Sequence, residues 1–326
     1  IMLCFAGVYY SYKKGRVLLN TILLSLGCII IGYTMFVPIV ERSAVNTPTN
    51  EYQPDNPYTL VRYLGREQYG SAPLIYGQTY NSKITGIKNG NYYNIMEQSD
   101  GSLKYEKLNK PAEPIYSPDE KVFFPRMYTS GGGGEYVQFY DAYTKGDATS
   151  ENYIPSFGDN LRYFFGYQLN FMYWRYFMWN FVGRQNDLHA SVPGDVYKGN
   201  WESGIGFIDK LHLGDMKEGP DYIVRSKAKN HFYFLPLILG IIGLIYQYKK
   251  DRHNFVVVLL LFFMTGVATV LYLNQPPFQP RERDYAYAGS FYAFAFWIGF
   301  AVLWLEYIFS KFIKNKNVAV AVASVI

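Results

Sequence analysis

The sequence has 326 residues, of which 49% are hydrophobic and 19% aromatic, and it carries a formal net charge of +5. The lysines and arginines are spread along the chain without a basic arm or an RNA-binding signature, so we expect no nucleic-acid partner. Cys4 and Cys28 both lie in apolar segments, which argues against a zinc site or a disulfide framework.

Apolar segments near both ends of the chain predict membrane spans, since a helix needs about 20 mostly apolar residues to cross a bilayer. Four segments have this composition, although the second is slightly short: 17–38, 232–248, 254–273 and 285–310. Residues 1–12 resemble the end of a further span and residues 318–326 the start of another, and the chain opens without Met. We therefore expect a fragment of a longer polytopic protein, with transmembrane helices in 1–38 and 231–326.

Residues 39–158 are more polar and predict an α+β region. Four segments carry the pattern, in chain order: a helix over 58–69, a short buried strand in "SAPLIYG", a hairpin in "YYNIMEQSDGSLKYEKL" and a short strand in "KVFFPRMYT". Asp100-Gly101 is a typical hairpin turn. The "GGGG" run at 131–134 lacks the Lys-Ser/Thr of a phosphate-binding loop, so we expect a hinge or turn there.

Residues 159–183, "DNLRYFFGYQLNFMYWRYFMWNFVG", have aromatic residues on every face of a helix, with Arg162 and Arg175 among them. Such a helix suits the membrane interface, where Trp and Tyr accumulate and arginines extend toward water. A buried helix of the polar domain is the alternative, and a further span would disturb the charge pattern described below. We expect 159–230 to contain an interfacial helix followed by an outer-face loop.

That loop places Arg184, Asn186, Asp187 and His189 close together in the sequence. Such a cluster could contact a sugar or a phosphate, or it could consist of ordinary loop residues. The sequence contains no His-Glu-x-x-His motif, nucleophile elbow or cysteine-rich metal signature. No metal site is therefore identified from the sequence.

Three short positive clusters predict the orientation of the spans. They join or follow successive apolar segments and are formed by Lys13, Lys14 and Arg16, by Lys249, Lys250 and Arg252, and by Lys311, Lys314 and Lys316. Alternating spans place all three on one side, which the positive-inside rule assigns to the cytoplasm. Residues 39–230 and 274–284 would then face outward.

The outward segment 274–284 ends in Arg281, Glu282, Arg283 and Asp284. A solvated loop whose charges cancel is the simplest interpretation. Ionisable groups at a membrane boundary are, however, frequent functional residues, and guanidinium groups chelate phosphate oxygens. We therefore expect Arg281 and Arg283 to bind a phosphate. The two carboxylates are candidates to orient the arginines, to hold a metal, or to act in acid–base chemistry.

Four strings of the sequence together resemble one bacterial membrane family: "NPYTLVRYLGREQYGSAPLIYGQ", "FFPRMY", "YWRYFMWNFVGRQND" and "NQPPFQPRERDYAYAGSFYAFAFWIG". This family is known as domain of unknown function 2723 and is grouped as glycosyltransferase family 117. It is similar to a protein O-mannosyltransferase of the secretory pathway. The resemblance covers nearly the whole chain and implies a partial GT-C-type helical bundle with an inserted outer-face α+β domain.

The resemblance also implies an activity: transfer of a sugar, mannose-like, from a polyprenyl-phosphate donor to a protein Ser/Thr or a glycan acceptor. The site would face the periplasm of a bacterial inner membrane, in contact with membrane lipid. Arg281 and Arg283 would then bind the donor phosphate, and Arg175, Arg184 and Asp187 would flank the acceptor or sugar. The principal catalytic carboxylate of GT-C enzymes precedes this segment, so the catalytic residue is unknown here, and a divalent metal stays open. A non-catalytic envelope scaffold and a transporter of an anionic lipid-linked substrate are the alternatives.

Overall fold

The computed structural model describes residues 2–67, 72–128, 134–146, 148–150, 152–216, 219–313 and 315–325. The chain divides into two compact units, one of Ile1–Ser71 with Ile84–Ile115 and one of Ala72–Lys83 with Tyr116–Ile326. The predicted α+β region 39–158 is therefore shared between the two units. Most of the glycine run expected to form a hinge, residues 131–133, lies outside the described residues.

Within its described residues, unit 1 contains four α-helices: α1 (Met2–Lys13), α2 (Val17–Thr34), α3 (Val37–Ala44) and α4 (Pro57–Leu64). The predicted helix from residue 58 is confirmed as α4, although it ends at Leu64. Asn56 begins it, because its side chain accepts hydrogen bonds from the backbone amides of Tyr58 and Thr59. The proline at the first helical position suits this start, since it needs no amide donor there.

The predicted hairpin is also confirmed in unit 1. Strands β3 (Asn91–Glu97) and β4 (Leu103–Asn109) pair antiparallel. Gly101 has φ +78 in the connecting turn, a conformation that glycine adopts without steric cost. Asp100 accepts hydrogen bonds there from the amide and hydroxyl of Ser102, at 2.9 and 2.6 Å. β2 (Ile84–Lys88) pairs with β5 (Glu113–Tyr116).

Unit 2 contains several short strands and helices. The predicted strands in "SAPLIYG" and "KVFFPRMYT" shrink to β1 (Tyr76–Gly77) and β6 (Val122–Phe123), which pair antiparallel. The expected burial of the first is wrong, since Ile75 and Tyr76 are exposed. The other short elements are η2 (Pro118–Glu120), α5 (Gly134–Asp141), β7 (Gly183–Arg184), α8 (Gly206–Leu213), α9 (Asp221–Val224) and β8 (Asn230–His231), where β7 pairs with β8.

The aromatic segment forms one continuous helix of α6 (Phe157–Tyr163), η3 (Phe164–Trp174) and α7 (Arg175–Phe181). Ser156 and Asp159 begin it with a reciprocal capping box. In η3 the turns are widened to a π-helix, so the amide of Arg175 donates to the carbonyl of Asn170, five residues back. Wide turns of this kind occur often at functional sites.

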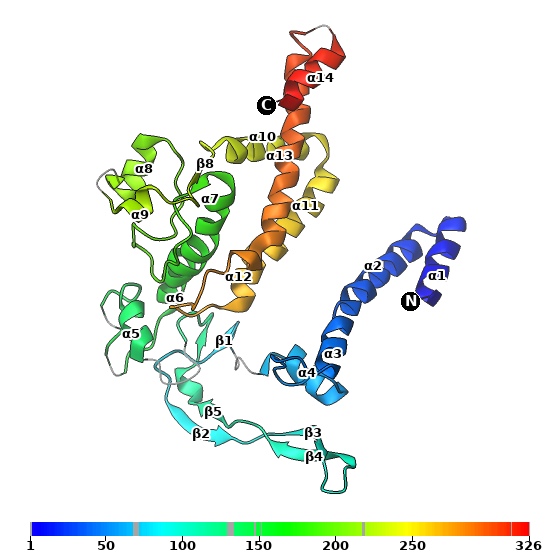
Figure 1. The fold of residues 1–326 in the computed structure, drawn as a ribbon, viewed down its shortest axis with the longest axis vertical. Helices are drawn as coiled ribbons and strands as arrows, with labels where there is room; N and C mark the ends of the chain where they lie inside the picture. The colour runs from blue at the N-terminus through cyan, green and yellow to red at the C-terminus, as the bar shows by residue number, and fades with distance from the viewer. Residues whose placement is uncertain are drawn as a thin grey trace. The chain divides into compact units, whose positions relative to one another are not determined.

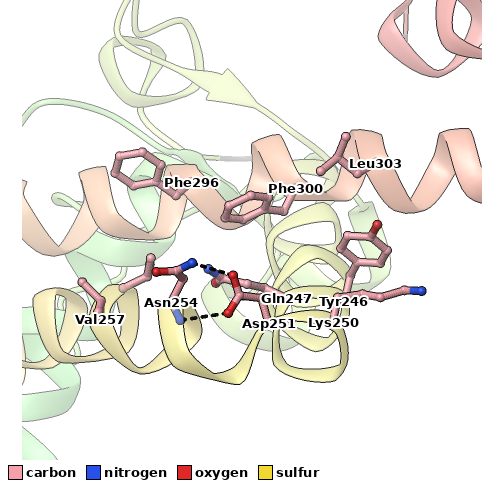
Figure 2. Close-up of a pocket in the computed structure, with 10 residues that line it drawn as sticks. Tyr246, Gln247, Lys250, Asp251, Asn254, Val257, Phe296, Phe300 and Leu303 are labelled. Carbon is pink, nitrogen blue, oxygen red and sulfur yellow. Dashed lines mark hydrogen bonds between the residues drawn. The ribbon is translucent and has the colours of Figure 1, made fainter. Parts of the chain in front are cut away.

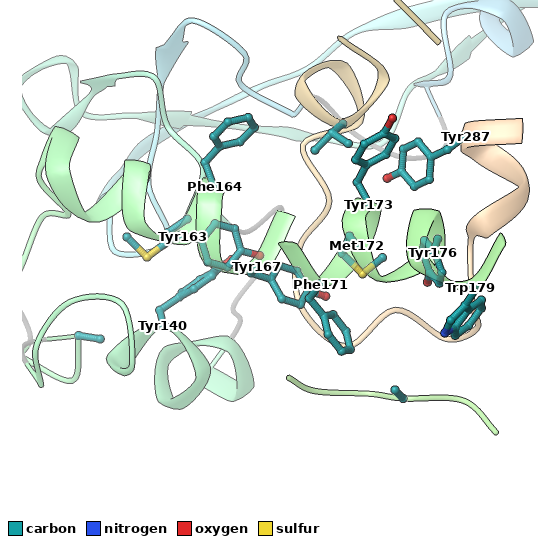
Figure 3. Packing of buried hydrophobic residues seen from close by; sticks show 14 residues of the cluster. Tyr140, Tyr163, Phe164, Tyr167, Phe171, Met172, Tyr173, Tyr176, Trp179 and Tyr287 are labelled. Atoms are coloured by element: carbon teal, nitrogen blue, oxygen red, sulfur yellow. The ribbon is translucent and has the colours of Figure 1, made fainter. Parts of the chain in front are cut away.

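Aromatic side chains of this helix form the main hydrophobic core of unit 2 (Figure 3). Four of its tyrosines are fully buried: Tyr163, Tyr167, Tyr173 and Tyr176. Their rings meet each other and neighbouring rings edge-to-face or offset, as Tyr163 does with Tyr140 at 5.3 Å, a favoured aromatic geometry. This burial is that of a core helix, the alternative to the interfacial helix expected from the sequence.

The later part of unit 2 is helical: α10 (Leu235–Lys250), α11 (Arg252–Thr265), α12 (Val267–Leu273), η5 (Asp284–Tyr287), α13 (Ala288–Phe309) and α14 (Lys316–Val325). In the described residues, three helices are long and apolar enough to cross a membrane: Val17–Ala44, Arg252–Leu273 and Asp284–Phe309. They match three of the four predicted spans. The fourth, 232–248, corresponds to α10, which has only 16 residues.

Helices α10 and α11 both pack along α13 (Figure 1). Gly243 lies at a close approach between α10 and α13, because a Cβ there would lie 1.7 Å from the carbonyl oxygen of Trp297. Small residues allow helix backbones to approach in this way. The indole of Trp297 in turn donates to the buried Gln247 side chain at 2.8 Å.

Two of the predicted cytoplasmic clusters meet at one end of α13. Lys250 and Lys311 both approach the ring of Tyr307, with Nζ at 5.7 and 4.5 Å from its centroid. The segment 274–283 leads into the opposite end of α13. The structure thus separates the Arg281–Asp284 run from these cations along the helix, as the predicted orientation requires; the side of the membrane stays a prediction.

Candidate functional site

The segment 274–284, which ends in the charged residues 281–284, begins at the buried Asn274. The Asn274 side chain donates to the carbonyls of Pro73 and Pro125 at 2.7 and 3.0 Å, and it accepts from Gln168 Nε2 at 3.0 Å. The Gln275 carbonyl accepts from Gln168 as well, at 3.0 Å. These bonds fix the beginning of the segment against the aromatic helix.

Glu282 is the centre of the site. Its carboxylate accepts from Arg175 Nη2 at 2.7 Å and from Nη1 at 3.3 Å, so the pair is bidentate. The Tyr176 hydroxyl donates to the same carboxylate, and the Ala190 amide donates to it at 2.8 Å. The Nδ1 atom of His189 lies 3.5 Å from Oε1. Groups from two separate parts of the chain, residues 175–176 and 189–190, thus surround one carboxylate.

Arg175 is itself held on several sides. The residue is only 6% exposed. It lies over the rings of Phe171 and Trp179 at 4.2 and 4.9 Å, and Nη1 donates to the Gly199 carbonyl at 2.7 Å. Gly199 has φ +59, and a Cβ there would lie 2.8 Å from the Leu188 carbonyl and 2.9 Å from Arg175 Nη1. Only glycine fits this backbone conformation and this space together.

The surroundings set the ionisation of Glu282. Burial alone would raise the pKa of this carboxyl, but the hydrogen bond and charge of Arg175, with the Tyr176 hydroxyl and the Ala190 amide, bring its pKa below the ordinary value. Burial, in contrast, raises the pKa of Tyr176. Near neutral pH the group is therefore an ion pair with a neutral tyrosine donor.

Arg281 and Arg283 lie on either side of this anchored carboxylate in the sequence. Arg281 is exposed, and its guanidinium lies 5.6 Å from the ring centroid of Tyr285. The Arg283 amide donates to the Tyr176 hydroxyl at 3.1 Å, while its buried Nε has no hydrogen-bond partner. Neither arginine pairs with a carboxylate among the residues that the structure describes.

The sequence suggested that Glu282 or Asp284 orients these two arginines. The structure instead directs Glu282 to Arg175, and its two oxygens are occupied by Arg175, Tyr176 and Ala190. Asp284 begins the short helix η5, which leads into α13. An acidic residue in the first turn interacts favourably with the helix dipole.

Of the three residues expected to flank the acceptor or sugar, the structure brings Arg175 and Arg184 together but not Asp187. Arg184 joins the Glu282 group indirectly, because its guanidinium lies 4.0 Å from the Trp179 ring that Arg175 also contacts. Its Nε donates to the Asn186 carbonyl at 2.8 Å. Asp187 is exposed in the loop that follows. The structure thus brings Arg175 and Arg184 to one aromatic platform and leaves Asp187 outside it.

Asn186, which the sequence placed in the same cluster, organises this loop. It is fully buried. Its side-chain oxygen accepts from the amides of Leu188 and Gly199 at 3.1 and 2.9 Å, and its amide donates to the Tyr197 carbonyl at 2.8 Å. These contacts are structural, because they bring Gly199 to Arg175 and leave no free polar atom for a ligand.

Sequence reasoning missed Tyr176 and Gly199. Tyr176 is one of many tyrosines in an aromatic run, and nothing in the pattern marks it as a hydrogen-bond donor to Glu282. Gly199 lies in an ordinary loop, and its positive φ becomes visible only in three dimensions. In the described ranges, no group of three or more His, Cys, Asp or Glu side chains could hold a metal ion.

Comparisons with known proteins link one segment of the chain to a family. Residues 70–165 match the model of a family of unknown function, DUF8416. The matched segment ends within α6–η3, before Arg175 and the 281–284 run. No curated protein and no solved structure matches the chain. The geometry of the Glu282 group is therefore the main guide to function.

Proposed function

We propose that this chain is part of a membrane glycosyltransferase that moves a sugar, mannose-like, from a polyprenyl-phosphate donor to a protein Ser/Thr acceptor at the outer face of the membrane. One observation carries the proposal. Glu282 is anchored by Arg175, Tyr176 and Ala190, and this places Arg281 and Arg283 beside it without carboxylate partners in the described chain.

The arrangement suits an anionic ligand. A guanidinium without a carboxylate partner keeps its donors available for phosphate oxygens, which it binds in a bidentate manner. Arg281 is exposed, and Arg283 has an unused buried donor at Nε. The run lies where the segment 274–283 enters a helix with the composition of a membrane span, and a lipid-linked phosphate is found at such a boundary.

In this proposal Arg281 and Arg283 stabilise the leaving group. When the sugar leaves its carrier, negative charge develops on the polyprenyl phosphate, and fixed cations lower the energy of that charge. Arg175 and Glu282 would act as positioning residues, because they hold the loop and are already saturated with partners. The base that activates the acceptor hydroxyl is none of these residues.

The test uses membranes that contain the full-length protein. They are incubated with radiolabelled polyprenyl-phosphate-mannose, and label in protein is compared for wild type, Arg281→Ala and Arg283→Ala. Loss of a charge-assisted hydrogen bond to phosphate is expected to lower transfer by about tenfold or more. Arg225→Ala is the matched control, since Arg225 is an exposed arginine of the same unit that faces Asp221 instead.

Each outcome separates the functions that the sequence left open. Label that falls only with the two loop arginines supports the transferase and the phosphate assignment. Label that survives both substitutions keeps the enzyme and removes the phosphate role. No label with mannose or with other polyprenyl-linked sugars would contradict the proposal and favour a scaffold or a transporter.

A further inference from the structure

A second feature lies at the other end of α13, away from the Glu282 group. An open pocket of about 470 Å³ is lined by the turn between α10 and α11 and by one face of α13 (Figure 2). Its volume falls within the range of roughly 300–1,000 Å³ that is typical of small-molecule sites. None of the residues discussed for sugar transfer lines it.

The pocket has an apolar wall and a polar rim. Val257, Phe296, Phe300 and Leu303 contribute to the wall. They belong to α11 and α13, which have the length and composition of membrane spans, so this wall would lie at the depth of lipid acyl chains. The polar rim is formed where α10 ends and α11 begins, near the predicted membrane boundary.

The rim is positively charged. Lys250 lines the pocket. Lys311 shares the Tyr307 ring with Lys250, and Arg252 begins α11 in the same turn, with its guanidinium over the Tyr248 ring. Within the described part of the chain, none of these three cations has a carboxylate partner.

One carboxylate, Asp251, also lines the rim, but it is engaged with Asn254. Asp251 Oδ1 accepts from the Asn254 amide at 3.1 Å, and Oδ2 accepts from Asn254 Nδ2 at 2.5 Å. Figure 2 shows these two bonds, with the Lys250 ammonium group extending away from them. Hydrogen bonds from the neutral Asn254 leave the charge of Asp251 in place. The turn from Lys249 to Arg252 nevertheless carries three cations and one carboxylate, so its net charge is positive.

We propose that this pocket binds an anionic phospholipid, with one acyl chain against the apolar wall and the phosphate over Lys250 and Lys311. Charge complementarity carries the assignment, since basic pockets between membrane helices on the cytoplasmic side bind anionic headgroups. The inference does not rest on sugar transfer, because it concerns other residues at the opposite end of α13.

The test is a lipid titration of the purified, delipidated full-length protein followed by native mass spectrometry. Phosphatidylglycerol is compared with phosphatidylcholine of the same acyl chains. We expect preferential retention of phosphatidylglycerol and about a fivefold loss of its affinity in Lys250→Gln, with phosphatidylcholine unchanged. Lys249→Gln is the matched control, because Lys249 is the adjacent lysine and does not line the pocket.

A second pair of variants tests the apolar wall. Val257→Trp fills the pocket and is expected to reduce retention of both lipids at least fivefold. Val256→Trp, at an exposed neighbour outside the lining, is expected to leave retention unchanged. If Val257→Trp does not fold, as judged by its melting curve, the two lysine variants alone decide.

Three results would overturn the proposal. Equal retention of the two lipids by the wild type would remove the charge argument. An equal effect of Lys249→Gln and Lys250→Gln would indicate diffuse surface attraction and no defined site. Retention unaffected by Val257→Trp in a folded protein would place the lipid elsewhere.

Discussion

The Glu282–Arg175 pair near one end of α13 and the Lys250 and Lys311 cations near the other have opposite surroundings. At the end that begins with Asp284, Glu282 and Arg175 are largely buried and bonded to each other, to a tyrosine and to backbone groups. At the end near Tyr307, Lys250 and Lys311 contact only aromatic rings in the described structure. The difference teaches that charges of the first kind hold the fold, whereas those of the second kind are available to a ligand.

The largest expected effect is at Arg175. Arg175→Met leaves the Glu282 carboxylate buried without its cation, so we expect the free energy of unfolding to fall by about 3–5 kcal/mol. Thermal melting in detergent measures the loss. The double variant Arg175→Met/Glu282→Gln should be less destabilised than the sum of the two single variants. Additive losses would show that the pair is not coupled.

Gly199 should be the next most sensitive position. Gly199→Ala places a methyl group against the Leu188 carbonyl and Arg175 Nη1 at a positive φ, so we expect a loss of about 1–3 kcal/mol in stability. Gly206→Ala is the control, because a Cβ at Gly206 meets nothing within 4 Å. Equal melting temperatures for the two variants would mean that the Gly199 turn adapts freely.

Low pH should destabilise the fold through protonation of Glu282. The folded-state pKa of Glu282 lies below its ordinary value of 4.5, so the ionised carboxylate stabilises the fold above that pH. This contribution is lost as the pH falls from about 5 through the lowered pKa. The melting temperature of the wild type should therefore fall over this window more steeply than that of Glu282→Gln. Parallel curves would assign the acid sensitivity to other groups.

The smallest effects on stability are expected at unpaired cations. Arg281→Gln and Lys250→Gln should each change the free energy of unfolding by less than about 0.5 kcal/mol, because neither removes a partner from a buried charge. Their effects should appear in ligand binding instead. A melting shift as large as that of Arg175→Met would erase the distinction between the buried ion pair and the unpaired cations.

Local pattern determined much of the secondary structure. Apolar length predicted three helices that could span a membrane, since this property depends on composition alone. Asp100-Gly101 predicted the hairpin turn, because the required backbone conformation is available to that dipeptide. The positive clusters predicted that Lys250 and Lys311 share one side, and in the structure they share Tyr307.

Tertiary structure alone decided the rest. The aromatic residues on every face of the 159–183 helix favoured an interface and left a core as the alternative, and packing against Tyr140 and Tyr287 buries many of them. The sequence marked Glu282 and Arg175 as candidates separately, 107 positions apart. Their pairing depends on long-range packing and on the backbone of Gly199, neither of which local spacing encodes.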